Sequence, residues 1–151
     1  MMQRFRVPVR PVPKGRPRVS YRGGRVITYT PAKTRRFENL VRAYAVANGI
    51  ELEEGDVGLL LRFETASPAD VSNLVKNVED ALNGIAYEDD RQVSVIVALK
   101  RPPGPLGEGV DIVVTQAKGL EELVESIFGR GVDEVSAYRK TKGPRPRNTP
   151  A

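Results

Sequence analysis

Residues 70–90 read DVSNLVKNVEDALNGIAYEDD, and we expect the residues that carry the chain's chemistry to lie in this stretch. The apolar side chains recur at helical spacing and predict an amphipathic helix: Val71, Leu74, Val75, Val78 and Leu82. We expect a polar stripe on its opposite side, made of Asn73, Lys76, Asn77, Asp80 and Asn83. Asn83-Gly84 predicts the end of the helix, because glycine readily adopts the left-handed conformation that closes one. The β-branched run QVSVIV at residues 92–97 then predicts a strand.

Carboxylates stand at both ends of this stretch. Asp70 begins the expected helix, and Asp89 and Asp90 directly precede the expected strand. We expect the fold to bring Asp70 near the other two, where their charges would repel unless a cation neutralised them. Carboxylate oxygens suit Mg²⁺ or Mn²⁺, and Mg²⁺ is often held by one or two carboxylates together with water and phosphate oxygens. The spacing therefore predicts a divalent metal site for phosphate chemistry.

A purely structural interpretation of the same residues also stands. Asp70 or Ser72 would cap the helix, Asp80 would be a solvated surface residue, and residues 88–90 would form a turn. Lys76 would then be an ordinary partner of Asp80 at spacing i, i+4, worth roughly 0.3–0.5 kcal/mol.

The composition excludes several classes of site. The chain has 151 residues, the length of one domain, and contains neither cysteine nor histidine. Disulfides, thiolate catalysis and zinc-finger or iron–sulfur sites are therefore excluded, and catalysis would depend on carboxylates, lysine and hydroxyls. Arginines near the start argue against a signal peptide, and no segment approaches the roughly 20 apolar residues of a membrane span. We expect a soluble, cytoplasmic protein with no membrane partner.

The charges are divided along the chain. Residues 1–42 contain 12 Lys and Arg against the single acid Glu38, residues 43–138 contain 7 against 18 acids, and residues 139–151 add five more cations. Basic ends around an acidic centre suggest that the ends hold a polyanion while the centre binds metal. Basic termini that only aid solubility are the alternative.

The order of elements predicts an α+β (mixed α/β) fold. We expect strands at residues 5–9, 57–64, 92–99 and 110–114, and a hairpin that turns at Gly23-Gly24. We expect helices to begin at Pro31, with Thr30 as N-cap, at Asp70 and at Gly119. These elements would form a few-stranded mixed sheet with two packed helices and an extra C-terminal helix at about 119–128. We expect residues 1–138 to form a single domain and residues 139–151 a disordered basic tail. An edge strand or the third helix could pair two subunits.

Five short motifs in this order resemble the RusA family of Holliday junction resolvases, over about residues 8–116. They are PKGRPR at 13–18, YTPAKTR at 29–35, DVSNLVK at 70–76, DALNG at 80–84 and DDRQV at 89–93. The resemblance implies a homodimeric endonuclease of recombination and repair, which uses Mg²⁺ or Mn²⁺ to cut two strands of a four-way DNA junction.

Site residues follow from this resemblance. It implies that Asp70 and Asp90 are catalytic acids that bind the metal, that Lys76 is the essential lysine, and that Asp80 is a further metal ligand. We expect the DNA backbone to be held by cations of the amino-terminal region: Lys14, Arg16, Arg18, Lys33, Arg35 and Arg36.

One position departs from the family pattern. Well-known members carry Asp-x-Asp-Asn where this chain has Asp70-Val71-Ser72-Asn73, so a neutral hydroxyl replaces one carboxylate. Either Asp80 or Asp89 compensates, or the metal binds more weakly, or the protein binds junctions and cuts them poorly. Two rival functions stay open: a non-catalytic protein that binds junctions or RNA, and a nuclease selective for flaps or forks.

Overall fold

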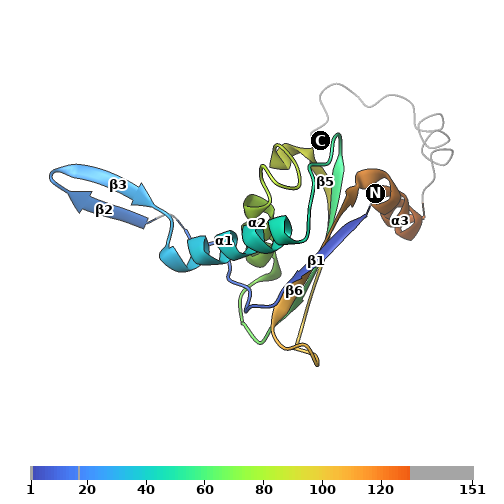
Figure 1. Cartoon of the computed structure of the whole chain (residues 1–151), viewed down its shortest axis with the longest axis horizontal. Helices are drawn as coiled ribbons and strands as arrows, with labels where there is room; N and C mark the ends of the chain where they lie inside the picture. Colours follow the sequence, from blue (N-terminus) through green and yellow to red (C-terminus); the bar gives the residue numbers. More distant parts are fainter. Residues whose placement is uncertain (1, 17, 130–151) are drawn as a thin grey trace, which may run out of the picture. The chain divides into compact units, whose positions relative to one another are not determined.

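A four-stranded mixed sheet forms the centre of the chain's first unit, residues 1–117 (Figure 1). The computed structural model describes residues 2–16 and 18–129. The strands lie in the order β1 (Gln3–Val7), β6 (Gly109–Gln116), β4 (Val57–Glu64) and β5 (Val93–Arg101). β4 pairs in parallel with β5, whereas the other two pairings are antiparallel. The sheet is therefore mixed, as the sequence predicts.

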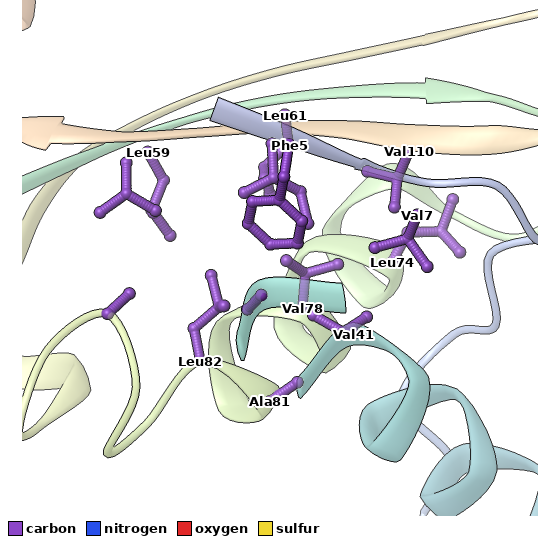
Figure 2. Close-up of a cluster of buried hydrophobic side chains, with 14 of the residues drawn as sticks. Phe5, Val7, Val41, Leu59, Leu61, Leu74, Val78, Ala81, Leu82 and Val110 are labelled. Atoms are coloured by element: carbon purple, nitrogen blue, oxygen red, sulfur yellow. The ribbon is translucent and has the colours of Figure 1, made fainter. Parts of the chain in front are cut away.

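Two helices supply the other half of the core, α1 (Ala32–Ala47) and α2 (Val71–Ala81). Figure 2 shows Val41 of α1 and Val78 of α2 among the same buried side chains as Leu61 and Phe5 of the sheet. Apolar residues alternate along β4, so that Leu59, Leu61 and Phe63 are all fully or almost fully buried. The α+β prediction with two helices packed on a mixed sheet is confirmed.

A two-stranded hairpin joins β1 to α1 in the chain. β2 (Arg18–Arg22) pairs with β3 (Arg25–Tyr29) through a turn at Gly23 and Gly24, whose φ angles are +56° and +74°. Two consecutive positive φ angles are the requirement of the tight turn that glycine pairs favour between antiparallel strands. The predicted hairpin is confirmed, and every residue of β3 is exposed.

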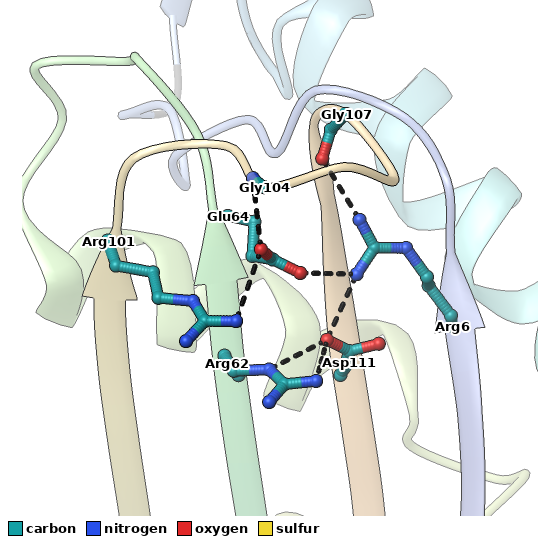
Figure 3. Close-up of polar contacts among 7 residues, drawn as sticks. All are labelled: Arg6, Arg62, Glu64, Arg101, Gly104, Gly107 and Asp111. Atoms are coloured by element: carbon teal, nitrogen blue, oxygen red, sulfur yellow. Dashed lines mark hydrogen bonds and ion pairs between the residues drawn. The ribbon is translucent and has the colours of Figure 1, made fainter.

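A polar network closes one end of the sheet (Figure 3). The buried carboxylate of Glu64 accepts hydrogen bonds from Arg6 at 2.9 Å, Arg101 at 3.3 Å and the backbone N–H of Gly104 at 3.2 Å. Arg6 also donates to Asp111 at 3.0 Å. The hydrogen bond from Arg6 lowers the pKa of Glu64, and the charges of Arg101 and Arg6 act in the same direction. The network connects the ends of β1, β4, β5 and β6.

The start of α1 differs from the prediction. Pro31, and not Thr30, is the residue at the N-cap, and no side chain caps the helix. The hydroxyl of Thr34 is buried inside the first turn and accepts the backbone N–H of Gly15 at 3.1 Å. A threonine inside the helix therefore attaches the proline-rich basic loop to it.

The predicted polar stripe of α2 is wrong at one position. Asn77 is fully buried and donates to the backbone carbonyl of Val12 at 2.8 Å, whereas Val71, predicted to face the core, is 38% exposed. The loop before the hairpin packs against the side of α2 that contains Asn77. The amide of Asn77 supplies the donor that the Val12 carbonyl needs once this packing covers it.

The third helix, α3 (Ala117–Phe128), confirms the predicted extra helix. It exposes Leu123, Ile127 and Phe128. Among residues 2–16 and 18–129 no helix is long and apolar enough to cross a membrane. The predicted tail at 139–151 lies outside the described residues, and the single domain at 1–138 stays a prediction.

Candidate active site

A compact turn returns the chain to the last turn of α2. Tyr87 is fully buried and its hydroxyl donates to the backbone carbonyl of Glu79 at 2.6 Å. Gly84, with φ of +80°, donates its N–H to the carbonyl of Tyr87 at 2.7 Å. This closed turn leads to a short 3₁₀ helix, η1 (Asp90–Gln92), so that Asp90 lies beside the end of α2.

Three carboxylates meet there. Oxygens of Glu79, Asp80 and Asp90 can be chosen within 4.8 Å of one another, and all three residues are partly buried. The ammonium of Lys76 lies 3.1 Å from Asp80, 3.6 Å from Glu79 and 3.8 Å from Asp90. A single cation therefore contacts all three carboxylates, which we call the acidic cluster.

The environment of the cluster changes its proton affinities. The hydrogen bond to Asp80 raises the pKa of Lys76 despite partial burial, and the neighbouring carboxylates add to the effect. Burial raises the pKa of Glu79, and the charges of Asp90 and Asp80 oppose its ionisation further. Lys76 therefore stays charged, and the negative charge of Glu79 is disfavoured by its burial and by the neighbouring carboxylates.

A second lysine reaches the cluster from the basic loop. The ammonium of Lys14 lies 2.6 Å from Glu38 of α1 and 3.1 Å from Asp80 of α2. Its backbone N–H donates to the carbonyl of Asn73 at 3.0 Å. Burial alone would lower the pKa of Lys14, but the hydrogen bonds to Glu38 and Asp80 outweigh it, so that the pKa is raised. Lys14, predicted to hold DNA, is thus already paired with two carboxylates.

The donor set of the cluster fits a hard divalent cation. Carboxylate oxygens are the ligands that Mg²⁺ and Mn²⁺ prefer, and Mg²⁺ is bound at about 2.0–2.1 Å with several waters retained. Small side-chain rotations would bring oxygens that already lie within 4.8 Å into one coordination shell. Lys76 and Lys14 offset part of the negative charge and would compete with the metal for Asp80.

The structure does not bring Asp70 to this cluster. Asp70 precedes the first residue of α2 and Asp80 lies in its last turn, so ten residues at 1.5 Å each separate their backbones by about 15 Å. Asp90 lies just before the start of β5, whereas Lys100 lies near the end of the same strand. Lys100 donates to the carbonyl of Ala69, the residue before Asp70, at 2.8 Å. The expectation that Asp70 and Asp90 meet within one chain is therefore wrong, although the catalytic role of each remains a prediction.

Asp89 has a capping role that the sequence did not predict, whereas the predicted cap by Asp70 is absent. The Asp89 side chain caps η1 by accepting the backbone N–H of Arg91 at 2.9 Å, and this hydrogen bond lowers its pKa. Asp70 occupies the N-cap of α2, but its side chain makes no capping hydrogen bond and is exposed. The neighbouring Ser72 is exposed as well.

The other predicted DNA contacts are exposed residues before and within the hairpin and α1. Arg16 precedes the hairpin, Arg18 opens β2, and Lys33, Arg35 and Arg36 occupy the first turns of α1; all five are exposed. Tyr29, Arg35, Ser20, Arg22 and Ile27 line a shallow hollow of about 450 Å³. Arg22 and Arg25, which flank the turn, add two exposed cations to this basic surface.

Sequence reasoning missed Glu79 as a candidate ligand. Its side chain reaches the cluster because Glu79 follows Lys76 by three positions, a spacing that places both on one side of a helix. That spacing was available in the sequence. The return of Asp90 was not, because it depends on the turn closed by Tyr87.

Comparison with known proteins agrees with the motifs. The family model of the endodeoxyribonuclease RusA matches residues 8–114. An uncharacterized Bacillus subtilis (strain 168) protein, YqaN, is 35% identical over 116 residues, which cover 60% of this chain and 80% of that protein.

Proposed function

The chain belongs to the RusA endodeoxyribonuclease family, and from this premise we propose that it resolves four-way DNA junctions by paired, metal-dependent phosphodiester hydrolysis. We place this activity in recombination and repair in the cytoplasm, with a homodimer as the acting form. The observation that carries the proposal is the acidic cluster, in which Lys76 and three carboxylates converge inside the region matched by the family.

Asp90, Asp80 and Glu79 are the residues proposed to hold a divalent metal. The family motif implies Asp70 as a further acid, although Asp70 lies at the other end of α2 in the same chain. When bound, Mg²⁺ or Mn²⁺ would polarise a phosphate oxygen and acidify a water, which suits a chain that contains no histidine. Lys76 would contact the scissile phosphate and oppose the charge that grows on it, because its ammonium already lies at the centre of the cluster.

The exposed cations of the hairpin and α1 are proposed to hold the DNA backbone. Lys33, Arg35 and Arg36 stand at the positive end of the α1 dipole, where cations are unfavourable unless an anion binds nearby. Phosphate contacts position DNA without reading its bases, so selection by branched structure would dominate over sequence. Lys14 is proposed to act within the protein, joining the loop to Asp80.

The test is a nicking assay on a synthetic four-way junction with Mg²⁺, Mn²⁺ or EDTA. We expect cutting with metal and none with EDTA. Asp90→Asn should lower cutting by roughly 10²–10⁴-fold while junction binding persists. Glu88→Gln is the matched control, since Glu88 is exposed, lies two positions away and, within the part of the chain that the structure describes, contributes only its backbone N–H to the turn. Cutting that survives EDTA, or binding lost in parallel with cutting, would contradict the proposal.

A non-catalytic junction-binding protein is the second candidate. It is favoured by Ser72, which replaces a family carboxylate, and by the two lysines that already neutralise Asp80. Tight binding of the four-way junction without cutting in either metal would support it. Flap and fork substrates in the same assay would identify a nuclease of different selectivity.

A further inference from the structure

A hollow of about 510 Å³ lies between the loop that follows β1 and the segment that leads into α2. Residues 10–13, Lys33 of α1 and residues 67–69 line it, and we call it the proline hollow. Sites for small ligands usually have volumes of about 300–1,000 Å³. None of the three carboxylates of the acidic cluster lines this hollow in the described structure, so the proposed metal chemistry does not account for it.

Hydrogen bonds fix the wall of the hollow that precedes α2. The backbone N–H of Ser67 donates to the buried hydroxyl of Thr65 at 3.0 Å, and the N–H of Ala69 donates to the hydroxyl of Ser67 at 3.2 Å. Lys100 donates to the carbonyl of Ala69 at 2.8 Å. This wall therefore keeps its shape without a ligand.

The wall formed by residues 10–13 is held as well. Asn77 of α2 donates to the carbonyl of Val12 at 2.8 Å. Glu108 joins this wall to the other one, because it accepts the hydroxyl of Thr65 at 2.6 Å and pairs with Arg10 at 3.4 Å. The proline hollow is therefore formed in advance, which lowers the ordering that a ligand would have to impose.

The lining combines apolar walls with positive charge. Five of its eight residues are apolar: Pro11, Val12, Pro13, Pro68 and Ala69. Two more are the exposed cations Arg10 and Lys33. Arg10 already pairs with Glu108, whereas Lys33 forms no ion pair among residues 2–16 and 18–129. Lys33 is therefore the cation that is available to an anionic ligand.

A nucleotide matches both parts of this lining. Its base has apolar faces that suit the proline walls, and its phosphate suits the cations. Because proline has no backbone N–H, the walls offer few groups that could read the edge of a base. The hollow would therefore accept any of the four bases. A base enters a pocket only after it leaves the stack, which costs least where the base is already unpaired.

We propose that the proline hollow binds one unstacked nucleotide of the bound DNA, with its base against the proline walls and its phosphate against Lys33 and Arg10. Its place in DNA recognition rests on the proposed function, whereas its affinity for a nucleotide does not. An intact duplex presents no unstacked base, and a branch point does. The hollow would therefore contribute to the selection of branched substrates, which phosphate contacts alone do not provide.

The first experiment titrates the full chain with dCMP, dAMP and deoxyribose 5-phosphate and follows the backbone amides by NMR. Both nucleotides should shift the amides of Val12 and Ala69 and leave the amide of Gly84, at the other end of α2, unchanged. Both should bind at least about fivefold more tightly than deoxyribose 5-phosphate, because burial of the base adds to the phosphate contact. No saturable shift with either nucleotide, or equal binding of deoxyribose 5-phosphate, would overturn the proposal.

The second experiment repeats the dCMP titration with Lys33→Gln. The variant should bind about two- to fivefold more weakly, as expected for loss of one exposed charge contact. Arg36→Gln is the matched control, because Arg36 is an exposed cation of the same helix that does not line the hollow. It should bind dCMP like the wild type. An equal loss in both variants would indicate attraction by general positive charge and would overturn the site.

The third experiment places the hollow in DNA recognition. A series of four-way junctions, each with one abasic nucleotide near the branch, is bound in EDTA and followed by fluorescence anisotropy. The wild type should lose affinity at one position of the series, and Lys33→Gln should lose less there. A uniform series for the wild type would show that no nucleotide of the bound DNA occupies the hollow.

The outcomes for the hollow and for the nuclease are separate. A wild type that cuts junctions but binds neither nucleotide would overturn the hollow and leave the nuclease function standing. A wild type that binds both nucleotides in the hollow but cuts no junction would overturn the nuclease function alone.

Discussion

Replacing Lys14 with methionine should change apo stability and metal affinity in opposite directions. Methionine keeps most of the apolar stem and removes the charge. The lost ammonium contacts Glu38 at 2.6 Å and Asp80 at 3.1 Å, with these side chains about a quarter exposed. Charge-assisted hydrogen bonds with this partial screening are worth about 2 kcal/mol together. For a chain of this length, that lowers Tm by about 4–8 °C in EDTA.

The metal effect follows from the charge of the cluster. Three carboxylates and two ammonium groups sum to one negative charge, and Lys14→Met makes this two. A divalent ion about 5 Å from the missing ammonium gains roughly 1.5 kcal/mol in a water-like dielectric, or about tenfold in affinity. The variant should therefore show a larger Mg²⁺-induced rise in Tm than the wild type.

The assay is thermal unfolding at a series of Mg²⁺ concentrations and in EDTA. Lys33→Met is the matched control, because Lys33 is an exposed cation of α1 that forms no ion pair among the described residues. It should leave both quantities close to the wild type. A Lys14→Met variant that melts like the wild type in EDTA, or gains no more from Mg²⁺, would refute the account of this lysine.

Two further predictions concern stability in acid and DNA binding. Glu64→Gln should lower the denaturation midpoint at neutral pH, and the difference from the wild type should shrink as pH falls below about 4.5. The hydrogen bond from Arg6 lowers the pKa of Glu64 in the folded state. The stability that the ionised carboxylate contributes is therefore present above the unfolded pKa of 4.5 and is lost as pH falls through the folded value. A difference between variant and wild type that persists at pH 2 would count against this prediction. Joint replacement of Lys33, Arg35 and Arg36 by glutamine should weaken junction binding and reduce the slope of log K against log salt by up to about 2.7, measured by fluorescence anisotropy; an unchanged slope would remove them from the DNA surface.

Local patterns predicted the elements well, because their causes are local. The period of apolar residues in α2, the Gly23-Gly24 turn and the β-branched run before Lys100 each depend on a few neighbouring residues. The mixed α+β architecture then follows from burying their apolar faces together.

The contents of the site depended on contacts distant in sequence. Periodicity could not show that Asn77 is the polar residue covered by the Val12 loop. Nor could it show that Lys14 pairs with Asp80. The separation of Asp70 from Asp90 follows from helix length, and a count of 1.5 Å per residue along α2 would have predicted it.

The parallel pairing of β4 with β5 has a consequence for how such a protein diverges. Every candidate acid and Lys76 fall within one strand–helix–strand crossover, from Val57 to Arg101, whereas the exposed cations at residues 16–36 precede it in the chain. Mutation can therefore lengthen or recharge the region of residues 16–36 without altering the residues that we propose to bind the metal and contact the phosphate. Lys14 is the exception. It alone among the predicted DNA contacts forms an ion pair with the crossover in the described structure, so its replacement would also affect Asp80.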